Sequence, residues 1–219
     1  MAELLVVRHG QASFGAGDAG SYDRLSDLGR RQAQVAGDSL REAGWIPDRL
    51  ICGSLDRQRE TLTAMGFGDD IEVHPGWNEY DFHDLLTVRF GGAVPDAVRG
   101  DRKTHFRSLR ETILQWQGGG LEGAAETYAQ FADRVEAARV FSTDTPAERV
   151  LVVSSGGAIG QLVAASLNAP AEQMMALNLQ VKNTSMSRFI FSGRRFFLHE
   201  FNSTPHFAAP DRADLLTYS

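Results

Sequence analysis

Short apolar runs alternate with longer stretches of mixed character, and this pattern predicts strands and helices in turn. Continuous apolar runs rich in valine, leucine and isoleucine are typical of strands that are covered on both faces of a sheet. Such runs occur at residues 3–7 (ELLVV), 49–54 (RLICGS), 71–73 (IEV) and 149–155 (RVLVVSS). A further stretch, 187–201 (SRFIFSGRRFFLHEF), predicts two strands around a tight turn at Ser192-Gly193.

Helices are predicted after the first and the later of these strands. Residues 25–44 carry apolar side chains at helical spacing, with Ser26 as a candidate N-cap and Gly44 at the end. Residues 156–170 follow the strand 149–155 and have the same character. Because strand and helix alternate at both ends of the chain, we predict an α/β fold, a three-layer α/β/α sandwich around a mainly parallel central sheet.

The middle third of the chain differs from the two ends. Residues 80–145 lack strand signals and are expected to be mostly helical, with a flexible break at the glycines 118–120. We therefore interpret residues 1–219 as a single domain in which residues of about 80–145 form an inserted cap region.

Composition narrows the classes of partner. The formal net charge of −6 argues against a nucleic-acid or anionic-membrane surface, because both need a basic face. No apolar run is long enough to span a bilayer, and the N-terminal run lacks the basic leader of a signal peptide. The single cysteine, Cys52, excludes an internal disulfide. We expect a cytoplasmic protein without nucleic-acid or membrane partners, and its oligomeric state stays open, a homodimer included.

Polar and charged residues follow the predicted strands. In open α/β sheets, ligands bind beyond the carboxyl ends of the strands. The segments at these ends are Arg8-His9, Ser54 to Arg57, Glu79, and Ser155-Gly156-Gly157. Their shared location predicts one site at this edge of the sheet.

Arg8, His9 and Arg57 together suggest phosphoryl transfer. A guanidinium group is permanently charged and presents a planar fork to phosphate oxygens, and a neutral imidazole is a competent nucleophile toward phosphorus. Two guanidinium groups that face one cleft repel each other unless an anion lies between them. Position alone leaves a structural alternative for each residue. His9 would then be a hydrogen-bonded core histidine, and the two arginines would form ion pairs at the surface.

An ordered set of motifs favours the phosphoryl-transfer interpretation. The segments are RHGQA (8–12), LSDLGRRQA (25–33), GSLDRQRET (53–61) and WNEYDF (77–82), with NTSMSRFIF (183–191) near the end. In this order they resemble the histidine phosphatase superfamily, which is also called phosphoglycerate mutase-like. The resemblance covers nearly the whole chain.

The resemblance implies a role for each matching residue. His9 would attack phosphorus, Arg8 and Arg57 would hold the phosphoryl oxygens, and no metal or other cofactor would be needed. Glu79 would protonate the departing alkoxide and then deprotonate the attacking water, which requires a carboxyl pKa raised by burial. Further phosphate contacts are expected from Gln11, Ser155 and Gly156. The implied ligand is a small phosphorylated substrate or inorganic phosphate.

One departure from the family pattern concerns Ser155, which stands where the family usually has a second histidine. A serine hydroxyl is neutral and shorter, so losing the charge-assisted bond is expected to cost about 1–3 kcal/mol. The backbone amides of Gly156 and Gly157, at a helix start, are expected to compensate in part. Other histidines that are candidates to reach the site are His83, His199 and His206.

We therefore predict an enzyme, a metal-independent phosphatase that forms a phosphohistidine intermediate. A phosphoglycerate mutase-type transfer is the alternative, as is a weakly active or inactive module that binds phosphorylated ligands. A cysteine phosphatase is excluded, because its cysteine and arginine have five residues between them whereas Cys52 and Arg57 have four.

Overall fold

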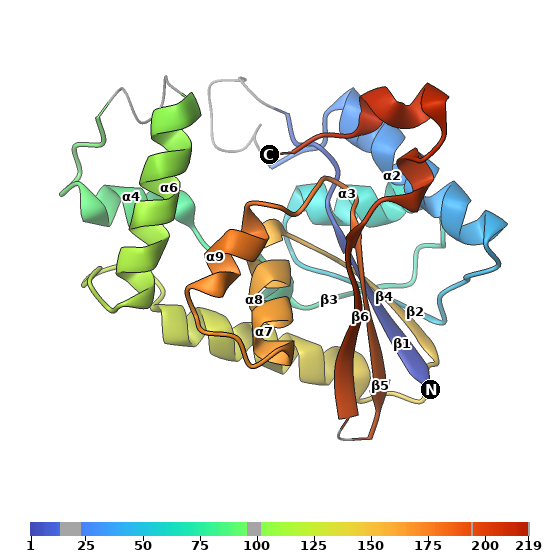
Figure 1. Cartoon of the computed structure of the whole chain (residues 1–219). Coiled ribbons are helices and arrows are strands. Elements are labelled where there is room, and N and C mark those ends of the chain that lie inside the picture. The colour runs from blue at the N-terminus through green and yellow to red at the C-terminus, as the bar shows by residue number, and fades with distance from the viewer. Residues whose placement is uncertain (14–22, 96–101, 194, 219) are drawn as a thin grey trace.

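A mixed sheet forms the centre of the molecule (Figure 1). The computed structural model describes residues 1–13, 23–95, 102–193 and 195–218. The strands are β1 (Ala2–Arg8), β2 (Arg49–Cys52), β3 (Ile71–Val73), β4 (Arg149–Ser154), β5 (Met186–Ser192) and β6 (Arg195–Ser203). They are ordered β3-β2-β4-β1-β5-β6; the first four are mutually parallel, and β5 and β6 form an antiparallel hairpin beside β1. The predicted strands and the mainly parallel sheet are confirmed.

The helices and short 3-10 turns lie between and after these strands. They are α2 (Asp27–Glu42), α3 (Asp56–Met65), η1 (Pro75–Trp77), α4 (Phe82–Arg89), α6 (Arg102–Gln117), α7 (Tyr128–Thr143), α8 (Gly156–Ser166), α9 (Gln173–Asn178), η2 (Pro205–Phe207) and η3 (Pro210–Leu215). Ser26 caps α2 as predicted, because its Oγ accepts a hydrogen bond from the amide of Gly29 at 3.0 Å. In the part of the chain that the structure describes, none of these helices has the length and apolar character needed to cross a bilayer.

Alternation along the strands divides the core into two layers. In β1, Leu4 and Val6 face one cluster of buried residues, whereas Leu5 and Val7 face the other. The first cluster includes side chains of α7 and α8, and the second includes side chains of α2 and α3. Helices therefore cover both faces of the sheet, and the three-layer sandwich is confirmed (Figure 1).

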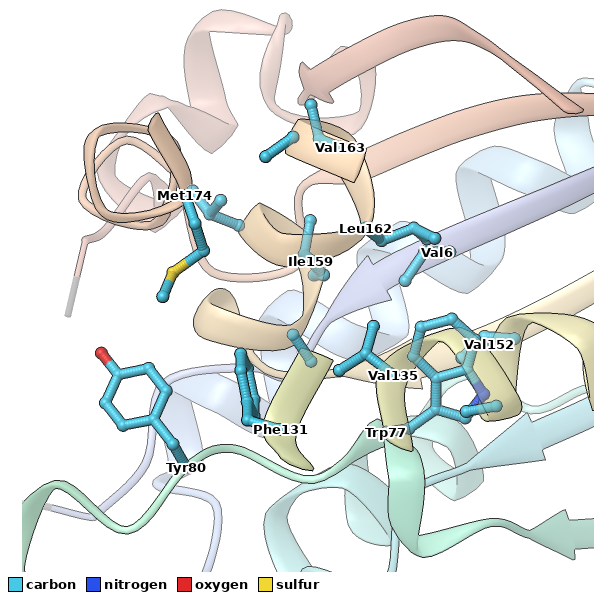
Figure 2. Packing of buried hydrophobic residues seen from close by; sticks show 14 of the residues in the cluster. Val6, Trp77, Tyr80, Phe131, Val135, Val152, Ile159, Leu162, Val163 and Met174 are labelled. Carbon is cyan, nitrogen blue, oxygen red and sulfur yellow. The ribbon is translucent and has the colours of Figure 1, made fainter. Parts of the chain in front are cut away.

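The α7–α8 face holds the larger core. Trp77, Phe131, Val152 and Ile159 come from four different elements and are all completely buried there (Figure 2). Helix α7 thus packs into the core, whereas α4 packs against α6 to one side of the sheet (Figure 1). The described part of residues 80–145 is helical as expected, and its assignment as an inserted cap stays a prediction.

The strand register brings the predicted site residues to one edge. Arg8 pairs with Ser154, and Cys52 pairs with both Val153 and Val73, so the parallel strands end level with one another. The residues that follow each strand therefore leave the sheet on the same side. This common edge is where the sequence predicts a site.

Replacement of Phe131 tests the contribution of α7 to the core. Because the ring is completely buried and packs edge-on against Tyr80 at 5.6 Å between centroids, Phe131→Ala is expected to lower the free energy of unfolding by about 3–5 kcal/mol. Val140→Ala, at an exposed position of the same helix, is the matched control, and its effect should stay within about 0.5 kcal/mol. Denaturant unfolding measures both, and similar effects for the two variants would contradict this packing.

Candidate active site

His9 directly follows β1, and each of its two ring nitrogens contacts another polar group of the protein. Its Nδ1 lies 2.8 Å from the carbonyl oxygen of Gly10. Since a carbonyl only accepts, the proton is on Nδ1 and Nε2 keeps its lone pair. Arg57 donates from Nε to this lone pair at 3.2 Å. The imidazole is therefore held neutral, with its nucleophilic nitrogen facing a guanidinium group.

The surroundings of His9 favour the same neutral form. Burial holds the pKa of His9 well below its ordinary value, and the positive charges of Arg57 and Arg8 lower it further. The hydrogen bond with the Gly10 carbonyl opposes this shift with a smaller effect. At neutral pH the ring is thus available as a nucleophile.

Arg57, near the start of α3, is held by a carboxylate as well as by His9. Asp23 accepts from Nη1 of Arg57 at 2.7 Å, and its other oxygen accepts from the amide of Asp56 at 3.0 Å. No pattern in the sequence marks Asp23 as a site residue. Asp23 fixes one arm of the guanidinium group, so that Nε points at His9.

Arg8, the last residue of β1, approaches the start of α8. Its guanidinium donates to the carbonyl of Val181, and its Cζ lies 3.6 Å from where a Cβ at Gly156 would stand. The charges of Arg8 and Arg57 act on both His9 and Glu79. The four predicted catalytic residues therefore lie close enough together for both arginines to influence the pKa of His9 and of Glu79.

Glu79 lies against the first turn of α8. Its Oε2 accepts from the amide of Gly157 at 2.9 Å, and a Cβ at Gly157 would stand only 2.1 Å from Oε1. Burial raises the pKa of Glu79, against the smaller opposing effects of the Gly157 amide and then of Arg57 and Arg8. A raised pKa suits a proton donor. The amide of Gly157, which was expected to help bind phosphate, instead contacts Glu79.

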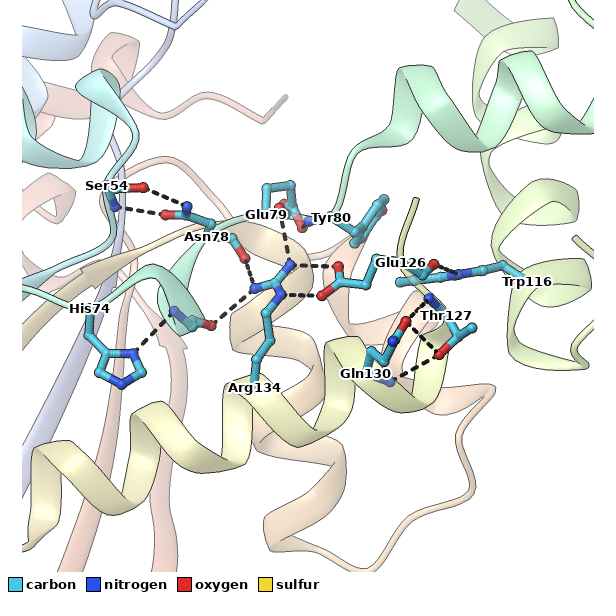
Figure 3. Close-up of polar contacts among 11 residues, drawn as sticks. Ser54, His74, Asn78, Glu79, Tyr80, Trp116, Glu126, Thr127, Gln130 and Arg134 are labelled. Atoms are coloured by element: carbon cyan, nitrogen blue, oxygen red, sulfur yellow. Dashed lines mark hydrogen bonds and ion pairs between the residues drawn. The ribbon is translucent and has the colours of Figure 1, made fainter. Parts of the chain in front are cut away.

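Arg134 of α7 fixes the backbone that carries Glu79 (Figure 3). It donates to the carbonyl oxygens of Gly76 at 3.1 Å, Asn78 at 2.8 Å and Glu79 at 3.3 Å. The same guanidinium pairs with both carboxylate oxygens of Glu126, at 2.5 and 3.0 Å. No pattern in the sequence marks Arg134 as a site residue. Arg134 satisfies carbonyl groups that have no strand or helix partner and so orders the loop.

Asn78 connects this loop to the segment before α3 (Figure 3). Its Oδ1 accepts from the amide of Ser54 at 2.7 Å, and its Nδ2 donates to the Ser54 hydroxyl at 2.7 Å. The paired contacts give the two segments a fixed relative position. Glu79 and Arg57, which follow these segments in the chain, are positioned by this contact.

Ser155 and Gln11 have polar partners within the protein. Ser155 is completely buried, and its Oγ accepts from Nε2 of Gln58 at 2.8 Å. The Oε1 of Gln11 accepts from the hydroxyl of Ser26 at 3.0 Å. Gly156 is the first residue of α8, beside Arg8. Phosphate contacts from Ser155, Gln11 and Gly156 stay predictions.

The other candidate histidines differ in environment. His83 on α4 and His199 on β6 are exposed. His206 is buried, and its Nε2 contacts the hydroxyl of Thr184 at 3.1 Å. Burial and then the charge of Arg212 lower the pKa of His206 to about 4, so this ring is neutral at pH 7 and supplies no positive charge.

Cys52 has the environment of a structural residue. It lies completely buried at the end of β2, and burial raises the pKa of its thiol to about 11. The thiol is therefore protonated at neutral pH, in agreement with the exclusion of a cysteine nucleophile. Across the described residues, no three His, Cys, Asp or Glu side chains gather into a group that would hold a metal ion.

Comparison with known proteins identifies the family of the chain. A model of the histidine phosphatase superfamily (branch 1) matches residues 4–204. A 2,3-bisphosphoglycerate-dependent phosphoglycerate mutase of Parvibaculum lavamentivorans is 28% identical over 187 residues, which are 80% of this chain and 85% of the relative.

Solved structures of two phosphatases share the fold. The alpha-ribazole phosphatase of Shigella flexneri has a TM-score of 0.65 at 21% identity, over 92% of this chain and 96% of that one. A mycobacterial glucosyl-3-phosphoglycerate phosphatase has a TM-score of 0.66 at 23% identity, over 93% of this chain and 100% of that one. Because the family model spans nearly its whole length, the chain belongs to the histidine phosphatase superfamily, branch 1.

Proposed function

We propose that this protein is a phosphatase that hydrolyses a small phosphomonoester in two steps, with the phosphoryl group carried on Nε2 of His9. The observation that carries the proposal is the pair of contacts on the imidazole. Nδ1 is held by the Gly10 carbonyl, and Nε2 is unprotonated beside the guanidinium group of Arg57. This arrangement is expected of a neutral nucleophile that lies beside a group able to bind a phosphate oxygen.

In the first step, Nε2 of His9 forms a bond to phosphorus as the ester P–O bond breaks. The N–H of Arg57 that now points at Nε2 turns to a phosphoryl oxygen, because the nitrogen lone pair is needed for the bond. Arg8 and Arg57 balance the charge of the transferring group. Glu79 gives its proton to the departing alkoxide, for which its raised pKa is suited.

In the second step, water attacks the phosphorus atom and the P–N bond breaks. Glu79, now a carboxylate, takes a proton from this water, so that inorganic phosphate leaves and neutral His9 and protonated Glu79 are restored. The amide of Gly157 stabilises the carboxylate between the two steps. Arg134 keeps the loop of Glu79 in place throughout the cycle.

The similar structures support a phosphate-containing ligand. The mycobacterial glucosyl-3-phosphoglycerate phosphatase has been solved with VO3 and with inorganic phosphate. A phosphoserine phosphatase mutant from Entamoeba histolytica, which shares the fold with a TM-score of 0.65, holds phosphoserine. Ligands of this chemistry match the two guanidinium groups beside His9.

A phosphoglycerate mutase activity is the second candidate, favoured by the sequence similarity to the Parvibaculum mutase. In a mutase, the phosphoryl group on His9 passes to a second hydroxyl of the substrate instead of to water. Interconversion of phosphoglycerates after priming with a bisphosphate would show a mutase. Release of phosphate from an aryl phosphate, in the presence of a chelator, would show a phosphatase and would exclude a module that only binds.

Replacement of His9 tests the identity of the nucleophile. His9→Ala should abolish phosphate release, because no other group occupies the place of the imidazole. Wild-type enzyme that carries the labelled phosphoryl group should lose this label in acid, because a P–N bond is acid-labile. Rapid quench with a ³²P-labelled substrate measures both. His199→Ala, at an exposed histidine of β6, is the control and should retain full activity. Label that survives acid would contradict a phosphohistidine.

If Glu79 is the proton donor, the loss of kcat/KM on its replacement should depend on the leaving group of the substrate. Glu79→Gln keeps an oxygen that can accept from the Gly157 amide but has no proton to transfer. Its kcat/KM should fall about 10²–10⁴-fold for an alkyl phosphate, whose leaving group needs the proton, and far less for nitrophenyl phosphate. Equal losses on the two substrates, with unchanged thermal stability, would contradict this role.

The titration of His9 tests the electrostatic basis of the site. In NMR titrations of isotope-labelled protein, the midpoint of His9 should lie below 6.5, and Arg57→Ala should raise it, because one of the two nearby cations is removed. Arg59→Ala removes an exposed charge from the same helix and is the control, with a much smaller shift expected. An unchanged midpoint in Arg57→Ala would show that Arg57 has no influence on the ring.

A further inference from the structure

Gln58 follows Arg57 on α3 and lies deeper in the molecule than the reactive groups. Arg8 and His9 keep 7% of their surface exposed and Arg57 keeps 8%, whereas Gln58 and Ser155 are both at 0%. The first three residues thus line space that solvent reaches. Gln58 and Ser155 have no exposed surface, and each is the chain neighbour of a predicted site residue, Gln58 of Arg57 and Ser155 of Gly156.

The orientation of the Gln58 amide follows from its partners. One of its neighbours is the carbonyl oxygen of Trp77, at 3.0 Å, which only accepts, so the nearby atom is Nε2. The second hydrogen of Nε2 goes to Oγ of Ser155 at 2.8 Å. The Trp77 carbonyl also accepts from Ser154 at 2.8 Å, so its two lone pairs are occupied. The amide is therefore fixed in one orientation between Trp77 and Ser155.

The carbonyl end of Gln58 lies in a space left by a glycine. A Cβ at Gly53 would stand 2.0 Å from Oε1, so any larger residue there would displace the amide. Small residues thus flank Gln58 on both sides, Gly53 at one end and Ser155 at the other. Oε1 itself is buried without a hydrogen-bond partner, which opposes folding. One end of the amide is thus fully hydrogen-bonded, whereas the other end fills the space beside Gly53.

We propose that Gln58 determines which groups contact the phosphoryl group, by filling the space beside Ser155 and keeping the side chain at position 155 away from the phosphate pocket, the space beside Arg8, His9 and Arg57. The proposal rests on the phosphatase function proposed above. With Gln58 in place, the phosphoryl group is held by Arg8 and Arg57 without a third cationic ligand. The proposal thus replaces the phosphate contact that the family resemblance implies for Ser155, whose hydroxyl bonds Gln58 instead. A larger basic side chain at position 155 reaches the pocket only when residue 58 is small.

Two variants at these positions test the proposal with vanadate, a phosphate analogue whose binding does not require turnover. In Ser155→His alone, the ring competes with the Gln58 amide for the same space, so vanadate affinity should not rise and the melting temperature should fall. In the double variant Gln58→Ala/Ser155→His, the ring has room, and vanadate should bind at least about tenfold more tightly than to the wild type. This gain should grow as the pH falls and the new imidazole becomes charged.

A matched control separates the pocket from general packing. Gln117, the last residue of α6, also has a buried Oε1 without a hydrogen-bond partner. Its Nε2 donates at 2.7 Å to the carbonyl of Ala171, which lies in the segment between α8 and α9. Gln117→Ala should leave vanadate binding unchanged. A full gain of affinity in Ser155→His with Gln58 present would overturn the proposal, because the ring would then reach the pocket without the space that Gln58 occupies.

A crystal structure of the wild-type vanadate complex tests the same point without any substitution. We expect the vanadate oxygens to contact Arg8 and Arg57, with the Gln58–Ser155 hydrogen bond intact. A vanadate oxygen within hydrogen-bond distance of the Ser155 hydroxyl would overturn the proposal. Absence of turnover in an enzyme that binds vanadate in this way would count against the phosphatase function and leave the role of Gln58 standing.

Discussion

The site depends on keeping an imidazole neutral beside two guanidinium groups that are largely withdrawn from water. Close positive charges and burial both disfavour the protonated ring, so His9 needs no general base to be nucleophilic. The same charges oppose the raised pKa of Glu79, whose burial has the larger effect. The same two arginines thus act on the proposed nucleophile, which must be deprotonated, and on the proposed proton donor, which must be protonated. The proposed reaction requires both of these states at the same pH.

This arrangement needs support, because buried charges are unfavourable without partners. Asp23 binds one arm of Arg57, and Glu126 pairs with Arg134 beneath the loop of Glu79. The contacts between Asn78 and Ser54 tie this loop to the segment before α3. Much of the polar structure around the site therefore holds Arg57 and Glu79 in position.

The sequence predicts those features whose causes are local. Apolar runs mark the strands, Ser26 marks the start of α2, and the residues after each strand mark the edge where His9, Arg57 and Glu79 meet. The sequence pattern does not predict helix α3, because the buried face of this helix includes Arg57, Gln58 and Thr61, which hide its apolar periodicity. The roles of Asp23 and Arg134 are equally unmarked, because an ion pair or a carbonyl contact between distant segments leaves no pattern in the chain. The packing of Gln58 against Ser155 is invisible for the same reason.

The order of strands in the sheet has a consequence for the synthesis of the chain. β4 lies between β1 and β2, although it is the fourth strand to be made. Until residues 149–154 leave the ribosome, β1 and β2 both lack β4, the neighbour with which they form backbone hydrogen bonds. During this time their apolar side chains cannot join a continuous sheet. In the nascent N-terminal half, both edges of β1 and one edge of β2 therefore stay unpaired for much of translation, a state in which binding by chaperones is an advantage.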